Sequence, residues 1–450
     1  MAIACVIAEM LTERSMKMAN LSSKTWVQEE ILHTVVNQKP EVHLRNVVVV
    51  GDANVVSEIG TDVRSYFNDI TTVEFVDLVG LPELKVQTQQ LVFIYKQIAE
   101  QTSDVDRLLE GTLRVLQDNG IAVIYEEIDT LTTKSIADLS TLFDSYNKEI
   151  DGVNAALKVY CMNQFEENDS GKLGVYWILE RTSEDVNDEN NEKMTGSWLD
   201  RTQYTEENIE AYEWIFGRDF ISPGGVDENR RFLSQFDGLA AGKTMLDIGC
   251  GIGGGPRQAA RELELQVLGC DISANMIAFA IARSIQEPDR RVRYQLTDAV
   301  QYRYKRESFD FAYSRDCVQH ISELTCLFAN IYNSLKPGGQ LLVTMYGKGK
   351  GRLTDEFLEY VKDRKYDLRS LDEVTKMLRA VGFQNVTGEN ITPRFEEILK
   401  KERQKAIDNR DEFMERFTDK KYESLLSGWK QKLRFISNDN HNWLKIKCTK

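Results

Sequence analysis

A glycine-rich segment, Met245–Gly255 (MLDIGCGIGGG), contains the residues that most clearly suggest ligand chemistry. Its glycines allow the backbone to turn sharply and to approach a ligand closely. The spacing of Gly249, Gly251 and Gly254 also fits the nicotinamide fingerprint G-x-G-x-x-G, so the loop alone does not identify its ligand. Asp247 stands two residues before Gly249, where a carboxylate suits an ammonium group and would repel a pyrophosphate. This favours S-adenosylmethionine over a dinucleotide.

Two further acids follow at intervals that suit the rest of such a cofactor. Asp271 lies 22 positions beyond Gly249, where a carboxylate can hydrogen-bond both ribose hydroxyls. Asp298, in the segment LTDA, could accept a hydrogen bond from the adenine amino group. Each acid alone could equally be a helix cap or a turn residue. Their occurrence together with the glycine loop and with LKPGGQLLV at Leu335–Val343 favours cofactor binding.

A parallel sheet can bring these residues to one edge, because its strands all end on the same side. Near-continuous apolar strands that alternate with amphipathic helices predict such a sheet, in a doubly wound, Rossmann-like α/β fold. The predicted strands are Thr244–Ile248, Gln266–Cys270, Val292–Leu296, Phe309–Tyr313 and Gln340–Met345, and the predicted helices lie near Pro256–Leu263, Ser273–Ile285 and Leu324–Leu335.

The first part of the chain shows a weaker version of the same alternation. Strands are predicted at Asn46–Val50, Val73–Val76, Leu91–Ile94 and Ile121–Tyr125, with a helix at Val105–Leu116. Only Gly51 follows the first strand, where the other half has five glycines. We therefore predict a degenerate, non-catalytic Rossmann-like domain over residues 1–182; an unrelated α/β domain is the alternative.

An acidic, asparagine-rich run, Ser183–Lys193 (SEDVNDENNEK), separates the two halves. Because it offers almost no apolar side chains to bury, it predicts a solvated linker, which we place at residues 183–195. The second domain then covers residues 196–450, and both domains are of ordinary size.

The composition limits the partners and the compartment. A formal charge of −15 argues against nucleic acid or an anionic membrane as the main partner. The sequence shows neither a signal peptide nor an apolar stretch of the roughly 20 residues that a membrane span needs. The seven cysteines form no CxxC pair. These features predict a reduced, cytoplasmic protein without structural zinc.

Several motifs carry a resemblance to known families. LDIGCGIGG and LKPGGQLLV resemble the class I S-adenosylmethionine-dependent methyltransferases. Over almost all of residues 203–450 the chain is similar to the phosphoethanolamine (phosphobase) N-methyltransferases. That resemblance implies S-adenosylmethionine as cofactor, S-adenosylhomocysteine as product, no metal, and successive methylation of one amine nitrogen. The motifs that carry it are QYT at Gln203–Thr205, YEWIFGRDFISPGG at Tyr212–Gly225, YSRDCVQHI at Tyr313–Ile321, EYVKDRKY at Glu359–Tyr366 and GWKQK at Gly428–Lys432.

Methylation of such an amine requires a proton acceptor, because the amine is largely protonated at neutral pH and only the free base attacks. His320, one of four histidines, follows the fourth predicted strand at the cofactor edge, and its ordinary pKa suits the task. From the residues alone, a capping or packing histidine is the favoured interpretation. The resemblance implies that Tyr204 and His320 form a catalytic pair and that Asp316 contacts the amine.

The other end of a phosphobase is a phosphate dianion, which needs a dedicated pocket on an acidic protein. Tyr360 and Arg364 are four residues apart in a helical stretch and share a face. Arg364 offers a planar fork and Lys432 a point charge, although both could be solvated surface charges. The resemblance places the phosphate among Tyr346, Tyr360, Arg364, Tyr366 and Lys432, and the cofactor against Ile221 and Ser222 of a lid, Ile272, Ala299, and Arg315 near the adenosine.

The resemblance is greatest to the nematode form of the family, in which two enzymes divide the methylation steps. This chain fits the enzyme with an active C-terminal domain, which implies conversion of phosphomonomethylethanolamine through phosphodimethylethanolamine to phosphocholine in phosphatidylcholine biosynthesis, by a monomer. One alternative keeps the fold but methylates a lipid or sterol carbon, which needs an apolar pocket. A regulatory binding protein and, more remotely, a nicotinamide dehydrogenase are the others.

Overall fold

The computed structural model describes residues 31, 34, 35, 37–39, 45–51, 72–76, 81, 84–95, 105–128, 133–166, 173–183 and 196–450. The chain divides into two compact units, Met1–Thr132 with Leu142–Val186, and Thr133–Thr141 with Asn187–Lys450. The N-terminal segment and most of the predicted acidic linker, residues 184–195, lie outside the described residues.

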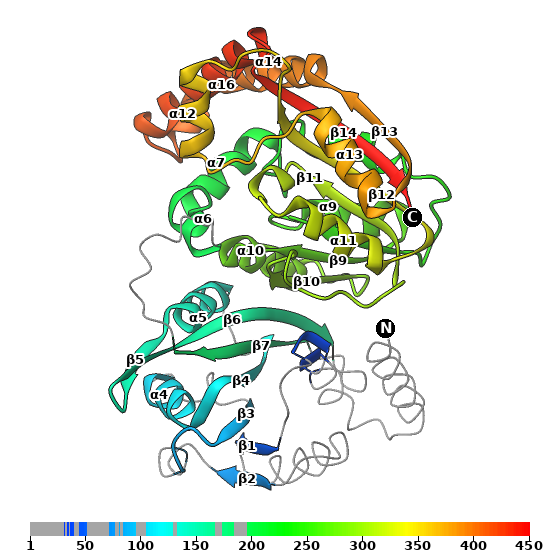
Figure 1. The fold of residues 1–450 in the computed structure, drawn as a ribbon. Helices are drawn as coiled ribbons and strands as arrows, with labels where there is room; N and C mark the ends of the chain where they lie inside the picture. Colours follow the sequence, from blue (N-terminus) through cyan, green and yellow to red (C-terminus); the bar gives the residue numbers. More distant parts are fainter. Residues whose placement is uncertain are drawn as a thin grey trace. The chain divides into compact units, whose positions relative to one another are not determined.

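The second unit is built on a sheet with the strand order β10-β9-β8-β11-β12-β14-β13 (Figure 1). The strands β8 to β12 pair in parallel, and β14 runs antiparallel to both β12 and β13. The bounds are β8 Thr244–Ile248, β9 Gln266–Asp271, β10 Val292–Thr297, β11 Phe309–Arg315, β12 Leu335–Lys348, β13 Gln384–Asn390 and β14 His441–Thr449.

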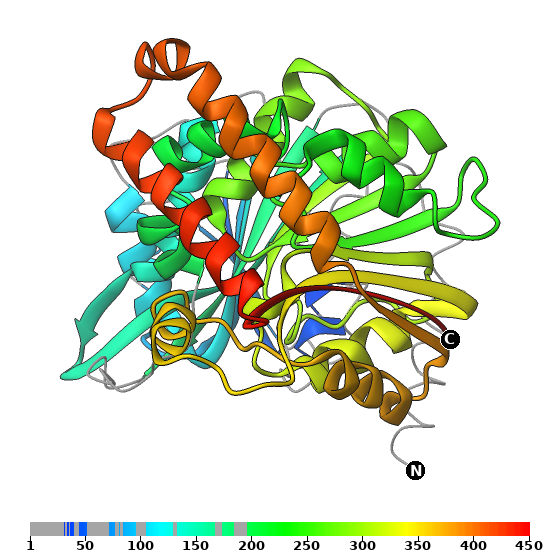
Figure 2. The same cartoon turned by 90° about the horizontal axis from the view of Figure 1, so that it is seen from above.

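Helices precede the sheet, connect its strands and extend beyond it. Seen from above, α14 and α16 lie side by side (Figure 2). The bounds are α6 Gly196–Thr202, α7 Glu206–Phe216, α8 Gly225–Leu233, α9 Gly254–Leu263, α10 Ala274–Gln286, α11 Leu324–Ser334, α12 Asp355–Asp363, α13 Leu371–Val381, α14 Thr392–Asp408, α15 Arg410–Met414 and α16 Asp419–Ser437, with a 3-10 turn at Val318–His320.

The strands and helices predicted for this unit are all present. β8 (TMLDI) is buried along its last four residues, as its apolar pattern requires. Ser273 caps α10 by accepting a hydrogen bond from the backbone N–H of Met276. Within β12, Lys336–Gly339 form an irregular turn, because Leu335 pairs with Phe309 and Gln340 with Phe311, and Gly338 has a φ of +75°. The carboxyl ends of β8, β9, β10 and β11 therefore meet at one edge.

The first unit repeats this plan. Its strand order is β2-β1-β3-β4-β7-β6, with β5 paired to β6; β1 to β4 are parallel, and β7 is antiparallel to β4 and β6. The elements are β1 Asn46–Val50, β2 Thr72–Val76, β3 Gln89–Tyr95, α4 Val105–Val115, β4 Leu116–Glu127, β5 Asn147–Ile150, β6 Val153–Glu166 and β7 Leu173–Thr182, and the chain also forms α5 at Thr133–Ser145.

The same break in strand register occurs in both units. In the first, Gln89 pairs with Leu116 and Leu91 with Ile121; in the second, Phe309 pairs with Leu335 and Phe311 with Gln340. Both breaks come directly after a helix that returns to a parallel strand. The predicted Rossmann-like fold of the first unit is thus confirmed. No helix in the described part of the chain is long and apolar enough to cross a membrane.

Candidate active site

A cavity of about 260 Å³ opens at the carboxyl edge of the second unit's parallel strands. The loops after β8, β9, β10 and β11 line one side of it, and residues of α7, of the loop before α8 and of α16 line the other. Every predicted site residue except Tyr360 lines this cavity. Tyr360 lies behind it, with its ring centroid 6.0 Å from that of Tyr366.

The glycine loop is fixed against the end of β9. The backbone N–H groups of Gly249 and Cys250 both donate to the carbonyl of Cys270, at 2.8 and 3.0 Å. Gly249 has a φ of +73°, and a Cβ there would lie 2.2 Å from Cys317 Sγ. A side chain is therefore excluded on both conformational and steric grounds. The loop forms a backbone cradle that a ligand can approach closely.

Two acidic residues of the cavity are buried or partly buried and have raised pKa values. Burial, together with the negative charge of Asp271, raises the pKa of Asp247 to about 7, against the opposing effect of Arg315. Burial also raises the pKa of Asp271 to about 6. Asp271 accepts hydrogen bonds from the backbone N–H groups of Gly251 and Ser273, at 2.9 and 3.0 Å. Such acids favour a cationic, hydroxyl-bearing ligand, because a nearby positive charge restores their ionised form.

Asp298 stabilises a turn, which is one of the two roles that the sequence allowed. Its carboxylate accepts from the backbone N–H of Val300 at 2.8 Å and from the side-chain amide of Gln301 at 2.9 Å. It lines the cavity together with Ala299, whose carbonyl accepts from Asn330 at 3.2 Å. The contact of Asp298 with an adenine ring stays a prediction.

Residues of α6, of α7 and of the loop before α8, which we call the lid, cover the side of the cavity that contains the glycine loop. Tyr204 lies in the turn between α6 and α7, where its carbonyl accepts from the side chain of Asn275 at 2.9 Å. Asp200 of α6 accepts from the backbone N–H of Ala274 at 3.0 Å, which anchors α6 on the start of α10. Ile221, in the loop that follows α7, packs on Gly251, where a Cβ would lie 3.4 Å from its Cδ1 atom.

Arg315 holds this lid loop. Its buried guanidinium donates to the carbonyls of Gly225 at 2.9 Å and Pro223 at 2.5 Å. Ser222 lies just before these residues and lines the cavity. The hydrogen bonds of Arg315 thus belong to the lid, and its expected contact with the adenosine stays a prediction.

His320 ends the 3-10 turn and faces the cavity from beneath the lid. Its ring lies edge-on to Tyr366, with centroids 4.9 Å apart. Its Nδ1 is buried without a hydrogen-bond partner, and within the described residues no hydrogen bond joins it to Tyr204. Burial and the positive charge of Arg364 lower the pKa of His320 to about 4, so the imidazole is neutral and able to accept a proton. A catalytic pairing with Tyr204 stays a prediction.

Asp316 offers the cavity an unused acceptor. It has a φ of +53°, a conformation that costs energy for a residue with a side chain. Its Oδ1 accepts from Thr344 Oγ1 at 2.9 Å and from Trp443 Nε1 at 2.6 Å. Its Oδ2 is buried and has no partner among the described residues. This oxygen can therefore accept a hydrogen bond from an amine or ammonium group.

The predicted phosphate-binding residues form a cluster of tyrosines and two cations. Lys432 Nζ lies 5.2 Å from the ring centroid of Tyr346, and the guanidinium of Arg364 lies 5.8 Å from that of Tyr360. Burial, and then Arg364, lower the pKa of Lys432 to about 8. Neither cation forms a salt bridge within the described part of the chain. The negative charges of Asp316 and Glu402 act on Lys432, but neither carboxyl forms an ion pair with it in that part of the chain, so the two buried cations can bind an anion.

Some lining residues had no predicted role. Gln203, Tyr212 and Trp429 lie in the motifs QYT, YEWIFGRDFISPGG and GWKQK, so their signal was present but had not been assigned. Gln319 donates to the carbonyl of Asp316 at 2.5 Å and accepts from the backbone N–H of Tyr346 at 3.4 Å, and so connects Asp316 to the tyrosine cluster. No group of His, Cys, Asp or Glu placed to hold a metal ion occurs among the described residues.

A glycine cradle and acids at consecutive strand ends of a Rossmann-like sheet are shared by dinucleotide-binding domains and class I methyltransferases. The comparisons with known proteins distinguish these classes, and they confirm the predicted methyltransferase fold. Residues 246–343 match the family model of a methyltransferase domain, and residues 25–185 match the model of the phosphoethanolamine N-methyltransferase 2 N-terminal region.

Relatives of known activity narrow this class to one family. Phosphoethanolamine N-methyltransferase 2 of Caenorhabditis elegans is 44% identical over 330 residues, which are 72% of this chain and 75% of that protein. The enzyme of Plasmodium falciparum is 34% identical over 257 residues, or 56% of this chain and 96% of its own length. The chain therefore belongs to the phosphoethanolamine N-methyltransferases, as predicted, and is an enzyme.

Solved structures agree with this assignment. Phosphoethanolamine N-methyltransferase 2 of Haemonchus contortus, in complex with phosphomonomethylethanolamine and S-adenosylhomocysteine, superposes with a TM-score of 0.88 at 35% identity, over 95% of this chain and 100% of that one. A second structure of that enzyme, with S-adenosyl-L-methionine, gives the same TM-score at 34% identity. The predicted cofactor is thus the one found in the solved relatives.

Proposed function

We propose that this chain transfers methyl groups from S-adenosylmethionine to phosphomonomethylethanolamine and then to phosphodimethylethanolamine, and so produces phosphocholine. One observation carries the proposal: a single cavity combines the glycine cradle, the neutral imidazole of His320 and the two unpaired cations Arg364 and Lys432. The solved relative that holds phosphomonomethylethanolamine and S-adenosylhomocysteine supports the same substrate class.

The residues of the cofactor end fit S-adenosylmethionine, whose bound sulfonium would supply an electrophilic methyl group. Asp247 would hold the α-ammonium group, Asp271 the ribose hydroxyls and Asp298 the adenine amino group. Gly249 and Gly251 would form the cradle beneath the ligand, with Ile272 and Ala299 at the adenosine and Ile221 and Ser222 above it. The basic pKa of Asp247 fits this assignment, since a buried carboxyl gains most from a cation.

At the other end, the residues of the chain would orient the amine and remove its proton. Asp316 Oδ2 would accept a hydrogen bond from the protonated amine, and Arg364, Lys432 and the tyrosines would hold the phosphate. His320 would accept the amine proton, which leaves the nitrogen lone pair free to attack the methyl carbon. Phosphate bound to Arg364 would offset the charge that lowers the pKa of His320, so substrate binding would make the base stronger.

A lipid or sterol acceptor suits this cavity less well. The far end contains Arg364 and Lys432, neither of which forms an ion pair among the described residues, and an apolar substrate would bring no negative charge to these buried cations. Methyl transfer to the three phosphobases, compared with transfer to a lipid acceptor, tests the proposal.

We also propose that only the second unit binds the cofactor, with residues 1–182 as a degenerate domain, residues 183–195 as a linker and residues 196–450 as the catalytic domain. Gly51 is the one glycine at the end of β1, whereas several glycines follow β8. The enzyme would act as a monomer in the cytoplasm, as the acidic charge and the lack of CxxC pairs suggest.

Cofactor affinity should depend on the protonation of Asp247. Because its pKa is about 7 in the free protein and an ammonium ligand lowers it, binding expels a proton below that pH. We expect the Kd for S-adenosylhomocysteine to rise by up to about tenfold per pH unit as the pH falls from about 7.5 to about 5.5. Calorimetry in two buffers with different ionisation enthalpies measures both the Kd and the released proton.

The Asp247→Asn variant is the control for this titration, and it should bind weakly without the dependence near pH 7. A Kd of the wild-type protein that stays constant over this range would contradict the role of Asp247. The same titrations give the stoichiometry, for which we expect one site per chain. Two sites would contradict a degenerate first domain.

A further inference from the structure

Glu402 of α14 is a buried carboxylate outside the set of predicted site residues. The residue as a whole is only 7% exposed. Oε1 accepts a hydrogen bond from the backbone N–H of Gly224 at 2.6 Å, and Oε2 is buried without a partner among the described residues. A carboxyl group buried in such a place is costly unless hydrogen bonds or protonation compensate for the lost contact with water.

Glu402 binds the segment between α7 and α8, Phe220–Gly225, which we call the lid loop. Arg315 binds the carbonyls of Pro223 and Gly225, and Glu402 binds the N–H of Gly224 between them. One backbone group of each of three consecutive residues is thus held by one cation or one carboxyl group. Gly224 has a φ of +82°, and a Cβ there would lie 2.6 Å from Glu228 Cβ, so this position of the loop requires glycine.

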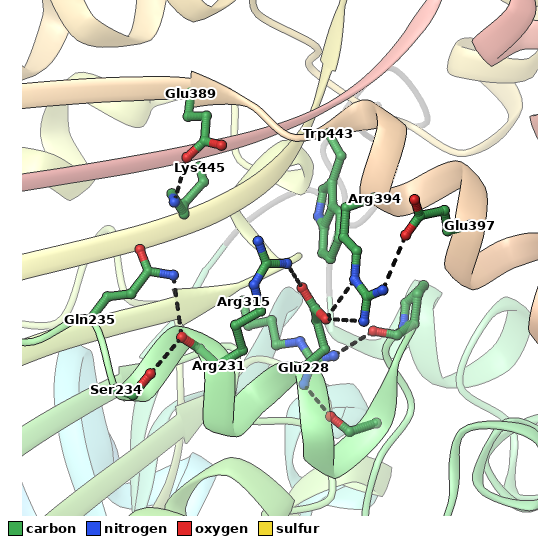
Figure 3. Close-up of polar contacts among 12 residues, drawn as sticks. Glu228, Arg231, Ser234, Gln235, Arg315, Glu389, Arg394, Glu397, Trp443 and Lys445 are labelled. Atoms are coloured by element: carbon green, nitrogen blue, oxygen red, sulfur yellow. Dashed lines mark hydrogen bonds and ion pairs between the residues drawn. The ribbon is translucent and has the colours of Figure 1, made fainter.

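The helix that bears Glu402 is itself anchored to both ends of the lid. Figure 3 shows Glu228 of α8 between Arg231 and Arg394, and Arg394 of α14 donates to it at 3.0 Å. Lys405, also on α14, donates to the carbonyls of Trp214 and Ile215 at the end of α7, at 3.0 and 2.9 Å. α14 therefore gives Glu402 a fixed position relative to the loop between α7 and α8.

The loop matters because Ile221 and Ser222 line the cavity beside the glycine cradle. We propose that Glu402 is a positioning residue, which seats the lid loop over the cofactor end of the cavity through the N–H of Gly224. The inference rests on the proposed function, since it takes this end of the cavity as the cofactor site. Burial raises the pKa of Glu402 to about 8, although the Gly224 N–H and the positive charges of Arg315 and Lys432 act to lower it. A raised pKa agrees with a carboxyl group that the lid encloses.

Alanine at position 402 tests this role. We expect E402A to raise the Kd for S-adenosylhomocysteine and the KM for S-adenosylmethionine about tenfold, with a smaller change in kcat, because the N–H of Gly224 loses its buried hydrogen-bond partner. Hydrogen exchange of a peptide covering Phe220–Gly225 should become faster in the full-length protein. E402Q keeps an acceptor for Gly224 and should restore both values to within about threefold of the wild type.

The matched control is Glu396→Ala, on the same helix, where Glu396 pairs with Lys400 in a partly exposed i,i+4 contact. It should leave affinity and loop exchange unchanged. If E402A fails to fold, Glu402→Asp provides the same test with a side chain one methylene shorter. A wild-type Kd and unchanged exchange in E402A or Glu402→Asp would overturn the proposal. Hydrogen exchange of the lid loop is measured without ligand, so it tests the role of Glu402 independently of the substrate. A wild-type protein that methylates no phosphobase would refute only the proposed function.

Discussion

Replacing His320 with alanine is expected to lower kcat by a factor of about 100 or more, because the loss of a general base removes a contribution of that size. The imidazole is buried, neutral and free at Nδ1, so it is available to accept the proton of the amine. Steady-state rates with phosphomonomethylethanolamine at saturating S-adenosylmethionine measure the effect.

Binding and folding serve as controls for this variant. H320A should bind S-adenosylhomocysteine and phosphocholine within a few fold of the wild-type protein, since the proposed ligand contacts lie on other residues. The conservative His320→Gln variant, which keeps a polar side chain but cannot act as a base, should be as slow as H320A. Turnover near the wild-type rate in either variant would remove His320 from the mechanism.

Arg364→Ala is expected to raise the KM for the phosphobase about 100-fold, since charge-assisted hydrogen bonds to a dianion contribute roughly 3 kcal/mol. The variant should also move the acid limb of the pH profile of kcat/KM to higher pH, because Arg364 lowers the pKa of His320. Initial rates over a range of phosphobase concentrations and pH values measure both effects.

Arg434→Ala is the matched control, because Arg434 pairs with Glu356 on the surface rather than in the cavity. It should leave the KM near that of the wild-type protein. An unchanged KM in Arg364→Ala would contradict the assignment of this end of the cavity to the phosphate.

Local patterns in the sequence were sufficient for the sheet and the cofactor loop. The apolar runs of β8 and β9 and the glycines after Asp247 each depend on neighbouring residues, and all were predicted at their observed places. The glycines of LKPGGQLLV fit the turn at Lys336–Gly339, where the register between β11 and β12 breaks. That break depends on pairing with β11, which no local pattern records.

Long-range contacts explain what the sequence did not reveal. Glu402 meets Gly224 across 178 residues, and no motif marks it as part of the lid. Arg315 lies in the motif YSRDCVQHI, but its bonds to the Pro223 and Gly225 carbonyls appear only in the folded protein. Asp298 shows the converse, because its turn hydrogen bonds are local and were foreseen as one of two readings.

Product analysis with the three phosphobases tests the central claim most directly. Phosphoethanolamine, phosphomonomethylethanolamine and phosphodimethylethanolamine would each be incubated with the full-length protein and methyl-labelled S-adenosylmethionine, beside a sterol and a fatty-acid acceptor, and the products identified by mass spectrometry. We predict that phosphomonomethylethanolamine gives phosphodimethylethanolamine and then phosphocholine, and that neither lipid gains label. Label on a lipid carbon, with no methylated phosphobase, would contradict the account.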